Sequence, residues 1–214
     1  MTQPPEEHPP SPLEMLRDPR ALLDTTLAPV AFVIVYAITK DVNPSAIVAV
    51  AIGVIIAIER LIRRKPVMNA LGGLIGIAIA AFIAVRSGKA EGFFVPKMLY
   101  QLALAVVFAG SALIRKPLTG FIVAQLYRAE PGWVDLPAVR RVMTEYTLAW
   151  AVLFLLRGAI YAVLIAAGRV GLLAVVSIAM GFPSVALLLF LGYRYIPRRL
   201  EQLGAPQPGP EPPA

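Results

Sequence analysis

Two short basic turns, each lying between two apolar runs, constrain this chain more than any other feature. Residues 61–66 read Leu-Ile-Arg-Arg-Lys-Pro, and residues 113–117 repeat them in shortened form as Leu-Ile-Arg-Lys-Pro. Each preceding run also opens on a proline, Pro44 or Pro96, and the repeated lysines, Lys65 and Lys116, are 51 residues apart. Internal repeats set the architecture of a chain. This one, in which apolar runs of membrane length alternate with basic turns, predicts a protein that crosses a bilayer several times.

Composition supports a membrane protein over a soluble one. Of 214 residues, 58% are hydrophobic and 15% are charged, against roughly 45–50% and about 25% in soluble domains. The net charge of +7 comes from Lys and Arg at the ends of apolar runs, which indicates membrane orientation and no nucleic-acid partner. The chain has no cysteine, and its single histidine, His8, lies in a proline-rich tail. We therefore expect no metal site and no cofactor.

The apolar runs predict an all-α fold with six transmembrane helices, at about 20–39, 45–62, 67–85, 93–114, 142–167 and 170–193. About 20 helical residues cross the roughly 30 Å hydrocarbon layer. Proline at 29 should kink the first helix, and Gly181 with Pro183 should kink the sixth. These helices are expected to form one domain, 18–195, flanked by disordered proline-rich tails at 1–17 and 196–214.

The segment after the second basic turn is too short to cross a membrane. Residues 118–127 would form only about 15 Å of helix. Leu118, Phe121, Ile122 and Leu126 share one face, while Thr119 and Gln125 interrupt the apolar run. The pattern predicts an amphipathic helix at the membrane surface or a re-entrant half-helix, and it does not choose between them.

Positive charge predicts the orientation of the helices. With both termini cytoplasmic, fourteen Lys and Arg residues fall on the inner side and five on the outer side, and Arg157 within a span completes the twenty. An inner excess of this size is typical of the positive-inside rule. The sequence therefore predicts an even number of spans, with both ends and the half-helix on the cytoplasmic side.

Small residues at every fourth position predict close helix packing in the first part of the chain. Such strips let helix backbones approach each other in lipid. The two strips predict a tight hairpin of the second and third helices around the first basic turn, although Ala and Gly are also common in membrane helices without this role. The second helix carries Ser45, Ala49, Gly53 and Ala57, and the third carries Gly72, Gly76, Ala80 and Ala84.

Arg157 is the most unusual residue, because it is a charge deep within the fifth predicted span. Such residues usually face a bundle interior or water and have a partner. Candidate partners are Asp24, Tyr36, Tyr161 and the carbonyls freed by the prolines at 29 and 183. The alternative is that the side chain of Arg157 reaches the outer headgroups.

Two further groups of polar residues are candidates for binding. Asp24, Thr25 and Thr26 precede the proline at 29, so they form a ligand or ion pocket at a helix break or only cap a kinked helix. The basic turns suggest contacts to anionic lipid headgroups, although orientation alone also explains their charge. The residues concerned are Arg63, Arg64, Lys65, Arg115 and Lys116.

Several short motifs follow one another in a recognisable order: Asp24…Pro29…Phe32…Tyr36, Phe93-Phe94…Pro96-Lys97…Tyr100, Lys116-Pro117-Leu118, Leu136-Pro137…Arg140-Arg141 and Leu148-Ala149-Trp150-Ala151…Phe154. This order resembles the intracellular septation protein A family of bacterial inner-membrane proteins. The similarity is closer to an actinobacterial multipass group, domain-of-unknown-function family 3159, over roughly residues 22–165. This resemblance implies a cell-envelope role linked to division and assigns no catalytic residue. Members of the actinobacterial group are often encoded near potassium-uptake components.

The sequence contains no zinc motif, nucleophile elbow or phosphate loop, and we expect no enzyme. The first hypothesis is a non-enzymatic protein of the bacterial plasma membrane that supports cell division or envelope maintenance through helix and lipid contacts. The alternative is a small transporter, channel or accessory subunit of cation uptake with a site near Arg157 and Asp24. Expected partners are membrane lipids and envelope or division proteins. A homo-oligomer is compatible with the sequence, which does not fix the oligomeric state.

Overall fold

The computed structural model of the chain describes residues 19–62 and 67–208; the side chains of 19–26, 60, 67–70 and 182 lie outside the described part. Every regular element in the described ranges is helical, as predicted. The chain divides into two compact units, unit 1 (Met1–Ala90) and unit 2 (Glu91–Ala214), where the sequence suggested one domain. Each unit is described by itself.

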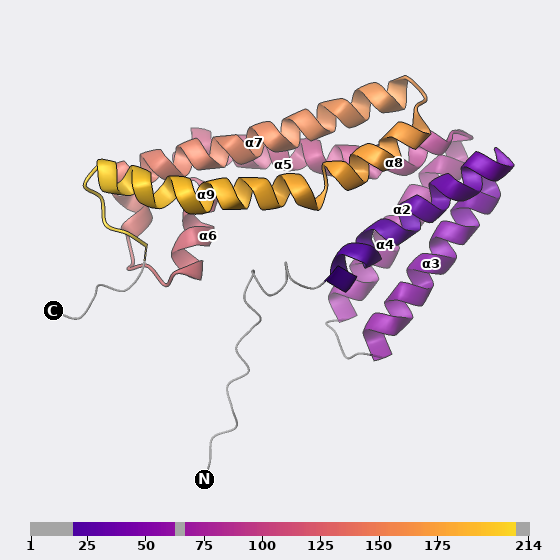
Figure 1. The fold of residues 1–214 in the computed structure, drawn as a ribbon, viewed down its shortest axis with the longest axis horizontal. Helices are drawn as coiled ribbons and strands as arrows, with labels where there is room; N and C mark the ends of the chain where they lie inside the picture. Colours follow the sequence, from indigo (N-terminus) through magenta and orange to yellow (C-terminus); the bar gives the residue numbers. More distant parts are fainter. Residues whose placement is uncertain (1–18, 63–66, 209–214) are drawn as a thin grey trace, which may run out of the picture. The chain divides into compact units, whose positions relative to one another are not determined.

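Unit 1 contains three helices, α2 (Pro19–Thr39), α3 (Val42–Ile62) and α4 (Val67–Ser87), which Figure 1 shows in indigo and magenta. Helix α3 packs against both α2 and α4. It begins three residues before the predicted span because Asp41 caps it: the Asn43 backbone N–H donates to Asp41 Oδ1 at 2.9 Å. Pro29 lies inside α2, as expected.

The small-residue strip of α3 is buried along its whole length, at Ser45, Ala49, Gly53 and Ala57. A Cβ atom at Gly53 would lie 2.9 Å from Ile77 Cδ1 and 3.4 Å from Leu74 Cδ1 of α4. The strip therefore allows the close α3–α4 approach that the predicted hairpin requires. The basic turn of this hairpin, at 63–66, lies outside the described residues.

The matching strip of α4 needs a correction. Ala80 and Ala84 are buried, but Gly72 and Gly76 are exposed, and a Cβ atom at either glycine would meet nothing within 4 Å. In the first half of α4, the side chains that reach Gly53 are Leu74 and Ile77, which lie on a different face of the helix. Spacing by four residues identified a helix face, but the rotation of α4 turns the two glycines away from α3.

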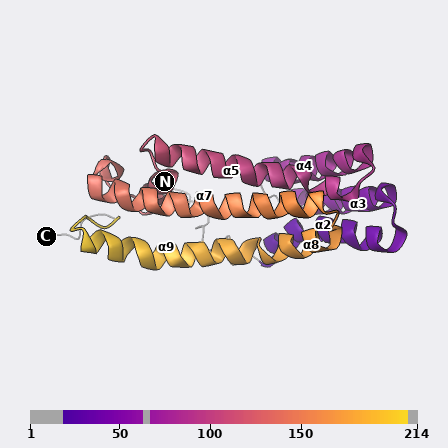
Figure 2. The same cartoon turned by 90° about the horizontal axis from the view of Figure 1, so that it is seen from above.

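Unit 2 is built around α7, which lies between α5 and α9 in Figure 2. Helix α7 also contacts α6 and α8. At 30 residues it is long enough to cross a bilayer and extend beyond it. The elements of unit 2 are the 3-10 turns η1 (Ala90–Phe94) and η2 (Trp133–Asp135) and the helices α5 (Val95–Leu113), α6 (Leu118–Leu126), α7 (Pro137–Ala166), α8 (Val170–Ala179) and α9 (Phe182–Gln202).

The last predicted span is broken into α8 and α9 at Met180 and Gly181, where the sequence predicts a kink. Pro183 occupies the first turn of α9, where its missing N–H is not needed. The Ser184 hydroxyl donates to the Met180 carbonyl oxygen at 2.6 Å, which satisfies one of the groups that the break leaves without a helical partner.

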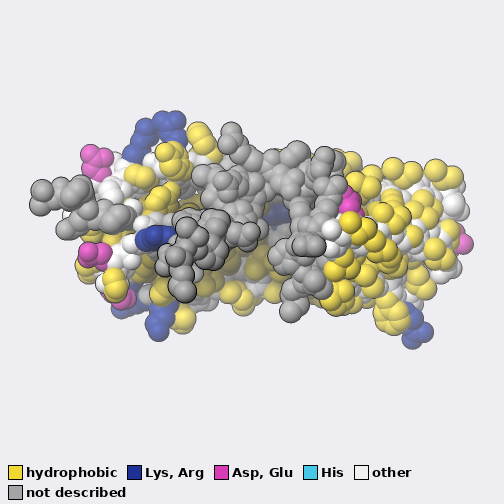
Figure 3. All heavy atoms as spheres, turned by 90° about the horizontal axis from the view of Figure 1, so that it is seen from below, with side chains coloured by type: hydrophobic (Ala, Val, Ile, Leu, Met, Phe, Trp, Pro, Cys, Tyr) yellow, Lys and Arg dark blue, Asp and Glu magenta, His cyan; other side chains and the backbone are white. Residues whose placement is uncertain are grey.

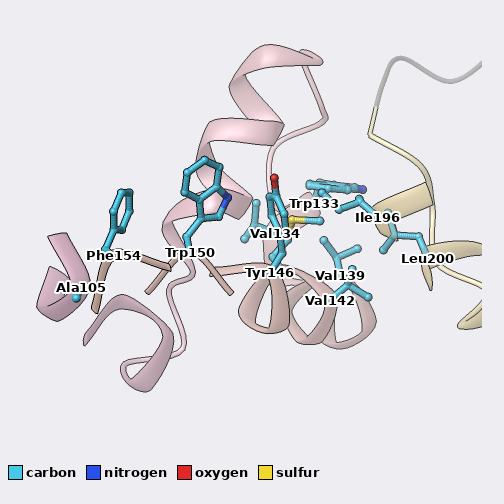
Figure 4. Packing of buried hydrophobic residues seen from close by; sticks show 11 residues of the cluster. Ala105, Trp133, Val134, Val139, Val142, Tyr146, Trp150, Phe154, Ile196 and Leu200 are labelled. Atoms are coloured by element: carbon cyan, nitrogen blue, oxygen red, sulfur yellow. The ribbon is translucent and has the colours of Figure 1, made fainter. Parts of the chain in front are cut away.

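Aromatic and aliphatic side chains of α7 form the hydrophobic core of unit 2 (Figure 4). Tyr146, Trp150 and Phe154 lie at i, i+4 and i+8, with successive ring centroids 6.3 and 5.7 Å apart. Phe108 of α5 packs edge-on to Phe154 at 5.2 Å. The Tyr146 hydroxyl donates to the Leu188 carbonyl oxygen of α9 at 3.1 Å. These three aromatic residues therefore serve to pack the helices of unit 2, as their spacing along one face of α7 indicates.

The C-terminal end of unit 2 is more ordered than the sequence suggests. Helix α9 continues to Gln202, so it includes the first seven residues of the predicted tail. Ile196 and Leu200 belong to the hydrophobic core, and the Trp133 indole Nε1 donates to the Pro206 carbonyl oxygen at 3.0 Å. Pro197 did not end the helix, because apolar packing at Ile196 and Leu200 offsets the lost backbone bond.

Among the described residues, four helical stretches are long and apolar enough to cross a membrane, and two shorter apolar stretches accompany them. The shorter stretches, Leu27–Thr39 and Leu71–Ser87, belong to α2 and α4, which are both 21 residues long. The chain is therefore a helical protein with several membrane spans. The four longer stretches are Val42–Glu59, Ala90–Leu113, Pro137–Ala166 and Val170–Gln202.

Candidate functional site

Arg157 is buried in the apolar part of unit 2, with 6% of its surface exposed. It lies on α7, nine residues before the helix ends at Ala166. A charge at such depth costs roughly 2.5–3.5 kcal/mol on insertion scales. Because its side chain is buried against protein, Arg157 does not reach out to the headgroups, and neighbouring groups must offset this cost.

The partner of Arg157 is Gln101 of α5, which is 4% exposed. We assign the Gln101 amide from the hydrogen-bond network, with its oxygen toward the guanidinium. Arg157 Nε and Nη2 then both donate to this oxygen, at 3.1 and 3.2 Å. Gln101 is neutral, so the pair orients the guanidinium and satisfies two of its N–H groups without neutralising its charge.

Three more polar side chains connect to this pair. Lys97, one turn before Gln101 on α5, holds its Nζ 5.7 Å from the centroid of the Tyr161 ring on α7. The Tyr161 hydroxyl donates to Ser177 Oγ of α8 at 3.1 Å. Lys97 and Arg157 are close enough to repel each other electrostatically. We call these five residues of α5, α7 and α8 the cationic cluster: Lys97, Gln101, Arg157, Tyr161 and Ser177.

A glycine sets the distance between the two helices at the cationic cluster. A Cβ atom on Gly158 would lie 2.5 Å from Leu102 Cδ2 and 2.8 Å from Leu102 Cγ. Gly158 follows Arg157 on α7, and Leu102 follows Gln101 on α5. The close approach that glycine permits therefore coincides with the Gln101–Arg157 hydrogen bonds.

The cluster carries two positive charges, and none of the ion pairs between described residues includes either cation. Glu91, an acidic side chain at the start of unit 2, lies beside the α7–α8 connection, where its Oε1 would be 3.3 Å from a Cβ atom on Gly168. The side chains of the cluster offer hydrogen-bond donors from an ammonium, a guanidinium and hydroxyls. This arrangement suits a negatively charged group and repels a cation.

One candidate partner of Arg157, Tyr161, belongs to the cluster. The Tyr36 ring stacks on Phe32 within α2, with centroids 6.5 Å apart. Asp24, Thr25 and Thr26 are part of α2, but their side chains lie outside the described residues. Asp24 and Tyr36 belong to unit 1 and Arg157 to unit 2.

The second basic turn has a defined geometry. Arg115 adopts a left-handed conformation with φ of 60°. The N–H of Arg115 donates to the Ala112 carbonyl oxygen, and that of Lys116 to the Ser111 carbonyl oxygen, which is the Schellman pattern that ends many helices. Both basic side chains are exposed. The corresponding residues of the first turn, Arg63, Arg64 and Lys65, lie outside the described residues.

Charged side chains gather at the end of unit 2 where α9 and the α6–α7 connection lie (Figure 3). Glu145 of α7 accepts a hydrogen bond from the Tyr195 hydroxyl of α9. It also pairs with Arg141 at 3.4 Å and Arg199 at 3.9 Å. These exposed ion pairs contribute little stability each, but the charges mark this end of unit 2 as the end outside the hydrocarbon.

Helix α6 is fixed to α7 by buried polar contacts. The hydroxyls of Thr119 and Thr147 lie 2.6 Å apart, and both reach the Met143 carbonyl oxygen, at 3.1 and 2.7 Å. A Cβ atom on Gly120 would lie 2.9 Å from Val134 Cγ1, so the helix sits close to its neighbours. Thr119 therefore anchors the helix, although in the sequence it only interrupts an apolar run.

The opposite face of α6 is apolar and uncovered. Phe121, Ile122 and Leu126 are 50%, 56% and 49% exposed. Figure 1 shows α6 turned away from the common direction of α5, α7 and α9. At nine residues, the helix is too short to cross a bilayer.

The apolar helices, the charged end and the buried cationic cluster together define a multi-span helical membrane protein. A family model described as a protein of unknown function (DUF3159) matches residues 18–202. The chain belongs to this family, which confirms the closer of the two resemblances seen in the sequence. No curated protein and no solved structure matches the chain.

Sequence reasoning identified Arg157 but missed Gln101 and Lys97 as its neighbours. Both residues stand in a predicted apolar span, where single polar residues attract little attention. Their spacing was a usable signal, because Lys97 and Gln101 are four residues apart, as are Arg157 and Tyr161. Two such pairs share one face of each helix, and facing polar stripes favour a contact between the two helices.

Proposed function

We propose that this protein is a non-enzymatic component of a bacterial plasma membrane that supports cell division or envelope maintenance through contacts with lipids and partner helices. In this proposal α2, α3, α4, α5, α7 and the α8–α9 pair cross the membrane, and both termini face the cytoplasm. The positive-inside count and the basic end of unit 2 support this orientation.

The observation that carries the proposal is the way α6 is held. Its polar contacts face inward to Met143 and Thr147, and its large apolar side chains face outward. A helix that only added to the core of its own unit would turn its apolar side chains inward and its polar ones outward, since apolar side chains gain most from burial. The outward apolar face therefore serves a contact beyond the chain, with the lipid surface or with a helix lying on it.

Cation uptake at Arg157, the alternative drawn from the sequence, has less support. Lys97 and Arg157 repel each other, and both would repel a bound cation. The cationic cluster thus favours the opposite sign of ligand, so we do not extend the cation-uptake proposal to this site.

Deletion and complementation in the source bacterium test the envelope role. We expect the deletion strain to form elongated cells or cells with a weakened envelope, and the wild-type gene to restore them. The Phe121→Asp/Ile122→Asp variant should remain in the membrane fraction but fail to restore normal cells, because its α6 face can no longer contact lipid or an apolar partner. Glu130→Gln, at an exposed position of the α6–α7 connection outside this face, is the matched control and should complement fully.

Two results would refute this function. One is a deletion strain with normal cell length, septa and envelope resistance under every growth condition tried. The other is full complementation by the double aspartate variant, which would show that the outer face of α6 has no role in the cell.

A further inference from the structure

The cationic cluster has more positive charge and more donors than helix packing requires. A single buried Arg–Gln pair would be enough to join α5 to α7. Here a second cation, Lys97, stands one turn from Gln101 and over the ring of Tyr161, which is one turn from Arg157. Two like charges so placed in an apolar region repel each other. Unfavourable charge placed within an apolar region is typical of a functional site in membrane proteins.

The donors of the cluster are only partly used. A guanidinium has five N–H groups, and the bonds to Gln101 engage Nε and one N–H of Nη2, which leaves three without an acceptor among the described residues. The Tyr161 hydroxyl donates to Ser177 Oγ, and the Ser177 hydroxyl keeps its own proton to donate. The free groups of Lys97, Arg157 and Ser177 are therefore all donors, which matches a ligand made of acceptor oxygens.

The backbone beside the cluster is also interrupted, because Ser177 lies on the last turns of α8, just before the break at Met180 and Gly181. In membrane proteins, broken helices commonly line binding sites for charged ligands. Lys97 is partly exposed, whereas Arg157 and Ser177 are buried. The cluster thus extends from an accessible cation, Lys97, to a buried one, Arg157, so a ligand could enter from the side of Lys97.

We propose that Lys97, Arg157 and Ser177 form a binding site for an anionic phosphate group, with Gln101 and Tyr161 as positioning residues. Gln101 holds the guanidinium through Nε and Nη2, and Tyr161 orients the Ser177 hydroxyl. The phosphate belongs either to a phospholipid headgroup or to free phosphate. This inference does not depend on the envelope role, because it concerns what the site binds and not what the protein does in the cell.

The test uses the full-length protein purified in an uncharged detergent. One arm titrates inorganic phosphate by calorimetry, and the other adds phosphatidylglycerol in mixed micelles and counts bound lipids by native mass spectrometry. We expect one saturable equivalent in at least one arm. Lys97→Gln should weaken binding about tenfold, because a charge-assisted contact is lost. Arg157→Lys keeps the charge but loses the guanidinium fork that Gln101 holds, so it should also weaken binding.

The matched control is Arg169→Gln, an exposed cation in the α7–α8 connection of the same unit. It should bind like the wild type, and thermal unfolding should show that Lys97→Gln remains folded. Binding of phosphatidylglycerol alone identifies a lipid headgroup site, and binding of inorganic phosphate identifies a site for the free anion. The inference is overturned if neither probe binds saturably, or if Lys97→Gln binds the probe as the wild type does.

Discussion

Helix α3 of unit 1 and helix α5 of unit 2 occupy the same place in the sequence repeat, yet they pack in different ways. Each has a proline in its first turn, Pro44 or Pro96, and each ends at a basic turn. Helix α3 then packs against the helix that follows it, α4, through small residues. Helix α5 packs instead against α7, and the helix that follows it, α6, also docks on α7.

The difference follows from the length of the second helix in each copy. Helix α4 has 21 residues and can run back along the whole of α3, whereas α6 has nine and cannot cover α5. The face of α5 that α6 leaves uncovered packs on α7, and Gln101 lies in that contact. The α3–α4 interface thus depends on small residues, whereas the α5–α7 interface adds buried polar side chains to a close contact at Gly158, and these side chains belong to the candidate site.

The largest effect should come from breaking the polar interface on one side only. Gln101→Leu leaves the Arg157 guanidinium buried without its acceptor, which should destabilise the protein by about 2–3 kcal/mol. Changing both residues, in Gln101→Leu/Arg157→Leu, should recover much of this loss because no buried charge remains. Thermal unfolding of the wild type, both single variants and the double variant in detergent measures the coupling. Additive effects would show that the two side chains do not interact.

A smaller effect should separate the close helix contacts of the two units. Gly158→Ala forces Leu102 to move at both Cγ and Cδ2, and overpacking of this kind costs about 1–3 kcal/mol. Gly53→Ala meets Ile77 at the far end of its side chain, which can shift, so it should cost less. Gly72→Ala, which meets nothing within 4 Å, is the control and should not lower the unfolding temperature. An equal loss at Gly72 would place that glycine in an interface.

The helices themselves could be predicted from the sequence because apolar length and breaker residues act locally. The observed starts and ends differ from the predicted spans by a few residues, and the break at Gly181 was expected. At the start of α3 the difference is three residues and its cause is also local, the N-cap at Asp41. A larger error arose where tertiary contacts decide: core packing of Leu200 carried α9 through Pro197 into the predicted tail.

The site was harder to predict, because it depends on which helix faces which. Arg157 is conspicuous in the sequence because it is a charge within an apolar span. Its partner, however, depends on how α5 and α7 are rotated about their axes. The only sign of that rotation in the sequence is two pairs of polar residues, each spaced by four. The unknown rotation of α4 likewise explains why the packing predicted for Gly72 and Gly76 is not observed. Small residues are tolerated on any face of a membrane helix, so their spacing alone does not identify the face that packs.

The next effect, smaller than those above, is expected at α6, because the docking of α6 on α7 is where the second repeat differs from the first. Thr119→Val keeps the shape of the side chain and removes the hydroxyl that reaches Met143 and Thr147, a loss of about 0.5–1.5 kcal/mol. Because the chain has no cysteine, Ala124→Cys gives a unique label on the side of α6 that packs against the core of unit 2. The thiol should react faster with a maleimide in the Thr119→Val background, while Thr119→Ser should leave its rate unchanged. Equal rates in all three backgrounds would mean that the hydroxyl does not hold α6 in place.

The smallest effect should appear at the C-terminal end of unit 2, in the segment that follows α9. Trp133→Phe keeps an aromatic ring in the core but removes the Nε1–H bond to the Pro206 carbonyl oxygen, so only about 0.5–1.5 kcal/mol of local stability is lost. The segment after α9 should then be cut faster by a nonspecific protease, while the unfolding temperature of the whole protein changes little, because the segment opens locally. Trp150→Phe removes the other tryptophan and no bond to this segment, so it should not alter the cutting rate. If both variants are cut alike, the segment is held by apolar packing at Leu203 and Ala205, and the indole bond contributes nothing measurable to the order at this end of unit 2.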